Sequence, residues 1–144
     1  MQPILHLSFP VRDVVEARHF YVEVLGCEAA RAGDGFQDVW FYGMQITLQD
    51  RPDDMVPLSQ GSSRHFGVTL GRAQFESLIA RLVEKDVVWV VPVSTEHEGL
   101  GTEQTKAKIA DPSGNVIELK TYRDVEAALE ISPHAYPEAL EHGN

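Results

Sequence analysis

The sequence has one cysteine, few basic residues and no long hydrophobic run, and each absence excludes a class of protein. A single thiol, Cys27, permits no internal disulfide, so we expect it to be buried as a small apolar group. Twelve basic residues against 22 acidic ones give a formal net charge of -10 without a basic patch, which argues against nucleic acid or membrane partners. No apolar run approaches ~20 residues and no signal peptide is evident, so we expect a cytoplasmic protein.

The first half of the chain predicts a strand, a helix and three further strands. Residues 4–10 alternate apolar side chains with His6 and Ser8, which is typical of a strand. Asp13 and Glu16 have the spacing of a capping box, and apolar residues then recur at helical intervals until Gly26. Strands are predicted at residues 27–31, 36–42 and 44–49.

The second half repeats this order. A strand at residues 64–70 precedes a helix whose apolar positions each lie 58 residues after those of the first helix, and His65 lies 59 residues after His6. The strands that follow are predicted at residues 87–93, 104–110 and 116–121. Aligning the turn glycines Gly43 and Gly114 places Thr47 opposite Glu118 in the repeat.

This repeat predicts an α+β fold of two βαβββ modules, at about residues 3–50 and 64–122, in one domain spanning residues 1–130. Residues 131–144 are expected to form a C-terminal tail. Because each module has one helix, we expect the mixed sheets to close into one cup with the helices outside. The faces lining that cup are predicted to be largely polar, and carry His6, Ser8, Trp40, Tyr42, Gln45, Thr47, Gln49, His65, Thr69, Lys106, Lys108, Glu118 and Lys120.

Four segments of the chain carry a resemblance to a known family. They are the opening HLSFPVRD, the helix end FYVEVLG, the strand RHFGVTL, and the stretch GTEQTKAKIADPSGNVIELKTY. Together they resemble the vicinal oxygen chelate superfamily over roughly residues 3–123. That superfamily includes glyoxalase I, bleomycin-resistance proteins and extradiol ring-cleaving dioxygenases, and the sequence is most similar to its small dioxygenases of extradiol type.

The resemblance implies a divalent metal held by His6, His65 and Glu118. Two imidazoles and one carboxylate suit Fe(II), and are also compatible with Mn, Ni, Co or Zn. Glyoxalase-type sites have a fourth protein ligand where this chain has Thr47, a poor ligand, so the departure favours a three-ligand, dioxygenase-like site. The residues also allow a metal-free cup in which Glu118 accepts hydrogen bonds from the imidazoles.

Three polar residues near the ends of the second module are further candidates. His97, in a predicted loop at residues 94–103, is either a general acid or base at the mouth of the cup or a solvated loop residue. Tyr122 is either a hydrogen-bond donor to a substrate oxygen or a packed aromatic. Gln104 is expected to hydrogen-bond the substrate or a metal ligand.

The inward parity of Lys106, Lys108 and Lys120 predicts attraction of an anionic or enolate substrate, or else ordinary exposed strand lysines. The expected function is a metal-dependent, extradiol-type dioxygenase acting on a small substrate with adjacent oxygens. A glyoxalase-like isomerase or lyase and a metal-free, drug-sequestering protein are the alternatives. We expect a homodimer, whose cups are closed either within one chain or by exchange of modules between two chains.

Overall fold

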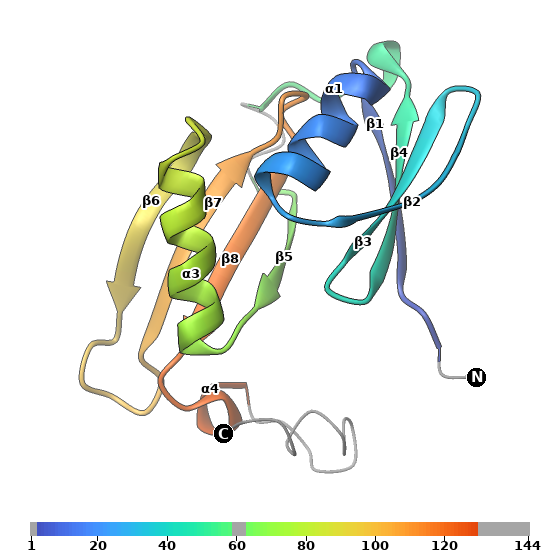
Figure 1. The fold of residues 1–144 in the computed structure, drawn as a ribbon. Coiled ribbons are helices and arrows are strands. Elements are labelled where there is room, and N and C mark those ends of the chain that lie inside the picture. The colour runs from blue at the N-terminus through green and yellow to red at the C-terminus, as the bar shows by residue number, and fades with distance from the viewer. Residues whose placement is uncertain (1–2, 59–62, 130–144) are drawn as a thin grey trace.

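The computed structural model describes residues 3–58 and 63–129, which form two separate four-stranded sheets (Figure 1). Sheet A belongs to the first module, and its strands in spatial order are β1 (His6–Val11), β4 (Met44–Asp50), β3 (Phe36–Phe41) and β2 (Glu28–Gly33). Sheet B belongs to the second module, and its order is β5 (His65–Thr69), β8 (Val116–Tyr122), β7 (Gln104–Ala110) and β6 (Val88–Glu96). The predicted α+β class and paired modules are confirmed.

The strand register follows the repeat found in the sequence. β1 runs parallel to β4 with His6 beside Gln45, and β5 runs parallel to β8 with His65 beside Val116. The two histidines therefore occupy equivalent places in equivalent edge strands. The turns that precede β4 and β8 also match, because Gly43 and Gly114 both have a φ of 84°, a conformation that favours glycine.

Each module places one main helix over one face of its sheet. In the first module, α1 (Val14–His19) is capped by the Asp13 side chain, which accepts a hydrogen bond from the Glu16 amide at 2.8 Å, as predicted. It continues as a π-helical turn, η1 (Phe20–Val24). The remaining helices are η2 (Pro52–Asp54), α3 (Arg72–Val83) and α4 (Val125–Leu129). Within residues 3–58 and 63–129, no helix is long and apolar enough to cross a membrane.

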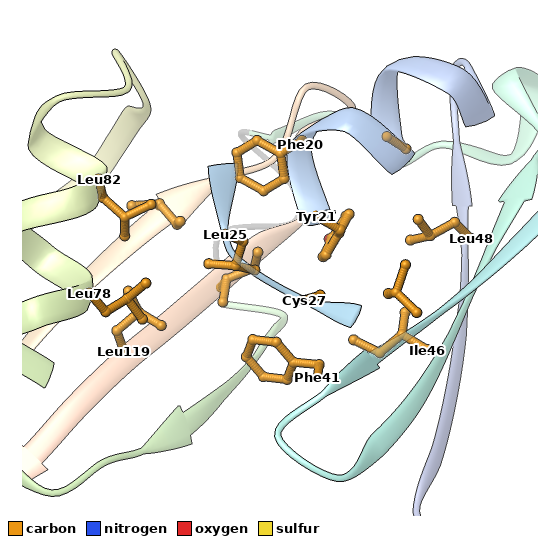
Figure 2. Close-up of a cluster of buried hydrophobic side chains, with 14 of the residues drawn as sticks. Phe20, Tyr21, Leu25, Cys27, Phe41, Ile46, Leu48, Leu78, Leu82 and Leu119 are labelled. Carbon is orange, nitrogen blue, oxygen red and sulfur yellow. The ribbon is translucent and has the colours of Figure 1, made fainter. Parts of the chain in front are cut away.

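The helix-covered faces of both sheets share a single hydrophobic core. Figure 2 shows the side chains of α1 and η1 between α3 on one side and sheet A on the other, with Phe20, Tyr21 and Leu25 facing Leu78, Leu82, Ile46 and Leu48. Burying each large apolar side chain stabilises the fold by about 1.5–3 kcal/mol. Cys27 lies in this core, where burial raises the pKa of its thiol to about 12. The expectation of an inert thiol is confirmed.

The arrangement differs in one respect from a cup with its helices outside. Arg81 of α3 donates a hydrogen bond to the carbonyl of Glu23 in η1 at 2.8 Å, so the helical segments of the two modules meet inside the chain. The buried Tyr21 hydroxyl also donates to Asp111 of the second module at 2.9 Å. The sheet faces that carry His6 and Glu118 point away from this core. We call them the polar faces of sheets A and B.

The hairpin between β6 and β7 is longer than predicted. Thr95 pairs with Thr105 and Glu96 pairs with Gln104, so the connecting loop is residues 97–103 rather than 94–103. The two threonine hydroxyls lie 3.0 Å apart, and a cross-strand hydrogen bond of this kind stabilises a register that apolar periodicity cannot indicate. The predicted tail at residues 131–144 lies outside the described residues.

Candidate functional site

Glu118 is the centre of the polar face of sheet B. Although it is charged, only 8% of its surface is exposed, because basic side chains from three strands surround it. His65 Nε2 on β5 lies 3.5 Å from Glu118 Oε2, and Lys120 Nζ on β8 lies 3.1 Å from the same oxygen. Lys108 Nζ on β7 lies 3.9 Å from Oε1. A buried carboxylate is thereby paired from both sides of its strand.

These neighbours keep Glu118 ionised. Partial burial by itself raises the pKa of this carboxyl, but the hydrogen bond and charge of Lys120, followed by the charges of His65 and Lys108, outweigh burial and hold the pKa below its ordinary value. Burial by itself lowers the pKa of Lys120, whereas its hydrogen bond with Glu118 raises it. Glu118 is therefore an anionic oxygen donor at neutral pH, as a metal ligand must be.

Gly67 allows β5 to lie close enough to β8 to place His65 beside Glu118. The two strands pair in parallel with Gly67 beside Glu118. A Cβ atom at position 67 would lie 1.9 Å from the Glu118 carbonyl oxygen, far inside van der Waals contact. The repeat-related residue in sheet A is Ser8, so this close approach is particular to sheet B.

His6 lies apart from that pair within one chain. It is exposed at the start of β1, on the polar face of sheet A, beside Gln45. Within residues 3–58 and 63–129, no group of three His, Cys, Asp or Glu side chains is close enough to hold one metal ion. The structure therefore brings together His65 and Glu118 of the predicted ligands and leaves His6 on the other sheet.

Thr47 belongs to a second polar cluster, in sheet A, whose centre is Asp38. The Thr47 hydroxyl donates to Asp38 Oδ1 at 2.6 Å, while Gln45 Nε2 and Arg31 Nε donate to Oδ2 at 3.1 and 3.2 Å. Burial raises the pKa of Asp38, but these three hydrogen bonds, with Thr47 first, lower it below its ordinary value. Sequence reasoning missed Asp38, although its parity along β3 is that of Trp40 and would have found it.

Of the three candidate lysines, Lys106 is held by a different carboxylate. Its Nζ lies 2.8 Å from Glu96 Oε1, and Gln104 Nε2 donates to Glu96 Oε2 at 2.8 Å. Gln104 pairs with Tyr122 in the sheet, four residues along β8 from Glu118, which corresponds to roughly 13 Å of strand. Gln104, Lys106 and Tyr122 therefore lie toward the end of sheet B, away from the His65–Glu118 pair.

His97 begins the loop that connects β6 and β7. It has a φ of 55°, in the left-handed region, and its carbonyl accepts the Leu100 amide at 3.0 Å. The Glu103 carboxylate accepts the Gly99 amide at 2.7 Å, which closes the loop on itself. The histidine is exposed beyond the Gln104 end of the sheet, so in a single chain it lies at the rim and not beside Glu118.

The sequence model of the Glyoxalase/Bleomycin resistance protein/Dioxygenase superfamily matches residues 3–119. The chain belongs to this superfamily. A search of curated proteins gave no match. Membership agrees with the paired modules and their register, and it confirms the superfamily indicated by the sequence segments.

Solved structures of the superfamily share the fold. The chain is similar to a glyoxalase/bleomycin resistance protein/dioxygenase from Alicyclobacillus acidocaldarius, with 30% identity, a TM-score of 0.74, and coverage of 88% of this chain and 96% of that one. The fosfomycin resistance protein FosX from Listeria monocytogenes shares 13% identity with a TM-score of 0.69, and the coverage is 89% and 98%. An integron cassette protein from V. cholerae shares 24% identity with a TM-score of 0.59, and the coverage is 85% and 96%. The last two establish only a common fold.

The residues around Glu118 fit part of the divalent metal centre that the sequence resemblance implies. An imidazole nitrogen and a carboxylate oxygen 3.5 Å apart are donors of the type that transition metals take, at a separation close to that of neighbouring ligands on one ion. Lys120 already pairs with the same carboxylate oxygen, so a cation has to compete with its ammonium group. Sheet B of one chain thus supplies two of the three predicted ligands.

Proposed function

We propose that this member of the superfamily is a metal-dependent enzyme whose first reaction to test is extradiol-type dioxygenation of a small substrate with two adjacent oxygens. The observation that carries the proposal is the approach of His65 Nε2 to Glu118 Oε2, at 3.5 Å, on a face where His6 is the repeat-related histidine. These two groups and His6 would hold the metal. When bound, the metal would supply Lewis acidity and a template for the two substrate oxygens.

The third ligand would come from a second copy of the chain. His6 is exposed on β1, which is an edge strand of sheet A, and His65 is on β5, an edge strand of sheet B. Ile4 and Leu5, just before His6, are 53% and 68% exposed, and such apolar side chains favour burial in a protein contact. A homodimer in which the polar face of sheet A from one copy covers that of sheet B from the other would bring His6 to the His65–Glu118 pair.

The lysines beside Glu118 would then act on the substrate. Their ammonium groups can only donate hydrogen bonds, so once Glu118 faces a metal they are left to neutralise an anionic substrate oxygen. Lys120, at 3.1 Å from Glu118, is nearer than Lys108, at 3.9 Å, and would contribute more. In the extradiol reaction both atoms of dioxygen enter the product and the ring bond next to the two oxygens breaks, so no external reductant is consumed.

Mixing two inactive variants tests the shared site. His6→Ala and Glu118→Ala, each expressed alone and without an affinity tag, should lose the bound metal. In a dimer that shares its sites, co-expression of the two variants should restore one intact site per mixed dimer, built from His6 of one copy and Glu118 of the other. The measurement is metal content of the mixed dimer by elemental analysis after anaerobic loading with Fe(II).

Three outcomes would contradict parts of this proposal. No metal in the unmodified protein after loading would exclude the metal enzyme altogether. Metal in the unmodified protein, with none restored in the mixed dimer, would exclude the shared site and retain the metal. Metal with turnover of a catechol in the absence of oxygen would replace the dioxygenase with an isomerase or lyase of the same superfamily.

One observation favours a second candidate, a metal-free protein that binds a small cationic compound. Lys120 is the closest neighbour of Glu118, so the polar face of sheet B is electrically satisfied without a metal. In this case an organic cation would displace Lys120 from the carboxylate. Binding of a cationic aromatic dye by the metal-free protein, lost in Glu118→Gln and retained in His6→Ala, would support it.

A further inference from the structure

The cluster around Asp38 has a feature that a metal site in sheet B does not account for. Asp38 is 1% exposed, yet it lies on the polar face of sheet A, next to exposed positions such as Ser8. Its two oxygens accept hydrogen bonds from Thr47, Gln45 and Arg31. A carboxylate this completely satisfied is not available to bind a ligand itself, so its effect must pass through the groups that it holds.

The charge of Asp38 fixes which way those groups point their hydrogens. An ionised carboxylate can only accept, so the Thr47 hydroxyl must spend its one proton on Asp38 Oδ1. The same argument assigns the amide of Gln45, whose nitrogen must face Oδ2 and whose carbonyl oxygen therefore faces away. Thr47 Oγ1 and Gln45 Oε1 are left as hydrogen-bond acceptors for a ligand.

An aromatic ring stands beside these acceptors. Trp40 pairs with Gln45 across β3 and β4, while Asp38 pairs with Thr47 in the same register. Trp40 and Asp38 are two residues apart on one strand and so share a face, at a spacing of roughly 7 Å. Trp40 is half-buried, which leaves part of the indole available for stacking.

We propose that the polar face of sheet A is a binding site for an aromatic ligand that carries a hydroxyl group. The ring packs on Trp40, the hydroxyl donates to Thr47 Oγ1 or Gln45 Oε1, and Asp38 is the positioning residue that makes both of them acceptors. An aromatic ether has the same ring without the donor and would be rejected, because it would set its oxygen against theirs.

The site deepens the proposed function but can be tested separately. The inference rests on that function only in identifying the aromatic hydroxyl with the substrate of the enzyme. Trp40, Gln45, Thr47 and Asp38 all belong to one sheet of one chain, and neither the metal nor Glu118 takes part. A failure of metal binding therefore leaves the prediction for this site unchanged.

Trp40 provides a direct measurement of binding. The chain has two tryptophans, and Trp89→Phe leaves Trp40 as the one indole whose fluorescence responds. In this background, the metal-free protein would be titrated with catechol and, as the matched control, with 1,2-dimethoxybenzene, with excitation at the red edge of indole absorption. Catechol should quench Trp40 with an affinity roughly three- to tenfold higher than that of the ether, which corresponds to one neutral hydrogen bond.

Two variants separate polarity from structure. Thr47→Val keeps the shape and removes the acceptor, so it should reduce the preference for catechol, whereas Thr47→Ser should retain it. Asp38→Asn gives the cluster a hydrogen-bond donor in place of a carboxylate, which frees the Thr47 proton to face the ligand. Its preference should shift toward 1,2-dimethoxybenzene, a change of sign that general loosening of the sheet would not produce.

The inference is overturned by any of three results. They are equal affinities for catechol and the ether in the unsubstituted Thr47 background, no change of the Trp40 signal with either compound, and an unchanged preference in Thr47→Val. If Asp38→Asn does not fold, the contrast between Thr47→Val and Thr47→Ser decides the question alone.

Discussion

Sheets A and B use one backbone plan for two different chemistries. At the same register, the residues across three strands are Ser8, Thr47 and Asp38 in sheet A, and Gly67, Glu118 and Lys108 in sheet B. In sheet A the carboxylate is on the third strand of this row and is saturated by neutral and cationic donors. In sheet B it is on the central strand beside an imidazole and two ammonium groups. The repeat preserves positions, while the side chains decide which sheet can offer an anionic ligand.

The largest difference between the sheets should come from Gly67→Ala. Because a Cβ atom here would meet the Glu118 carbonyl at 1.9 Å, β5 and β8 must separate. We expect a loss of about 1–3 kcal/mol or more in the free energy of unfolding, measured by urea denaturation. Ser8→Ala, the matched change in sheet A, should cost less than about 0.5 kcal/mol. Equal losses for the two variants would show that the sheets do not differ in strand spacing.

Tyr21→Phe tests the link between the modules, which the repeat does not copy. The second-helix counterpart of Tyr21 is Ile79, 58 residues later, which has no hydroxyl. The buried Tyr21 hydroxyl donates to Asp111, so its removal leaves that carboxylate without one donor and should cost about 1–3 kcal/mol. Ile79→Val should cost about 0.5–1.5 kcal/mol. Thermal unfolding followed by circular dichroism compares them, and a Tyr21→Phe loss no larger than that of Ile79→Val contradicts the prediction.

The stability contributed by Asp38 should depend on pH. Its folded-state pKa lies below the ordinary 3.8, so the unfolded chain binds its proton first as the pH falls. The stabilisation is therefore present above about pH 3.8 and is lost as the pH falls through the folded-state value. Asp38→Asn should be clearly less stable than the unmodified protein at pH 7, and the gap should narrow below pH 3.8.

Urea denaturation across that pH range measures the gap. The exposed Asp53, in η2, gives the control variant Asp53→Asn, which should change little at any pH. A gap between Asp38→Asn and the unmodified protein that stays constant with pH would show that Asp38 gains nothing from its charge.

The smallest effect concerns the two lysines at Glu118. Removing a cation near the proposed metal should tighten metal binding, more so for Lys120→Met than for Lys108→Met, because Lys120 lies closer to the carboxylate. Ion pairs with partial solvent exposure are worth about 0.2–1 kcal/mol, so the dissociation constant for Co(II) should fall by at most about fivefold. Calorimetric titration measures it. Weaker metal binding by Lys120→Met would contradict the proposed role of Glu118.

Local features of the sequence were sufficient to predict most of the fold. Turn glycines such as Gly43 and Gly114 need a positive φ, so their spacing revealed the repeat before any contact was known. Alternation along the strands placed His65 and Glu118 on one face, where the structure has them 3.5 Å apart. Asp38 was accessible to the same parity argument, but its three hydrogen bonds were not, because its donors come from β2 and β4.

By itself, then, the sequence determined the superfamily, the two βαβββ modules, the register of their parallel edge strands and the face on which each candidate ligand lies. These properties follow from dihedral preferences and side-chain periodicity, which act over a few residues. Only the tertiary structure decided that α1 and α3 meet inside one chain and that His6 stays apart from Glu118. The packing of one module against the other depends on side chains such as Tyr21 and Arg81 contacting residues far away in sequence, which no local periodicity encodes.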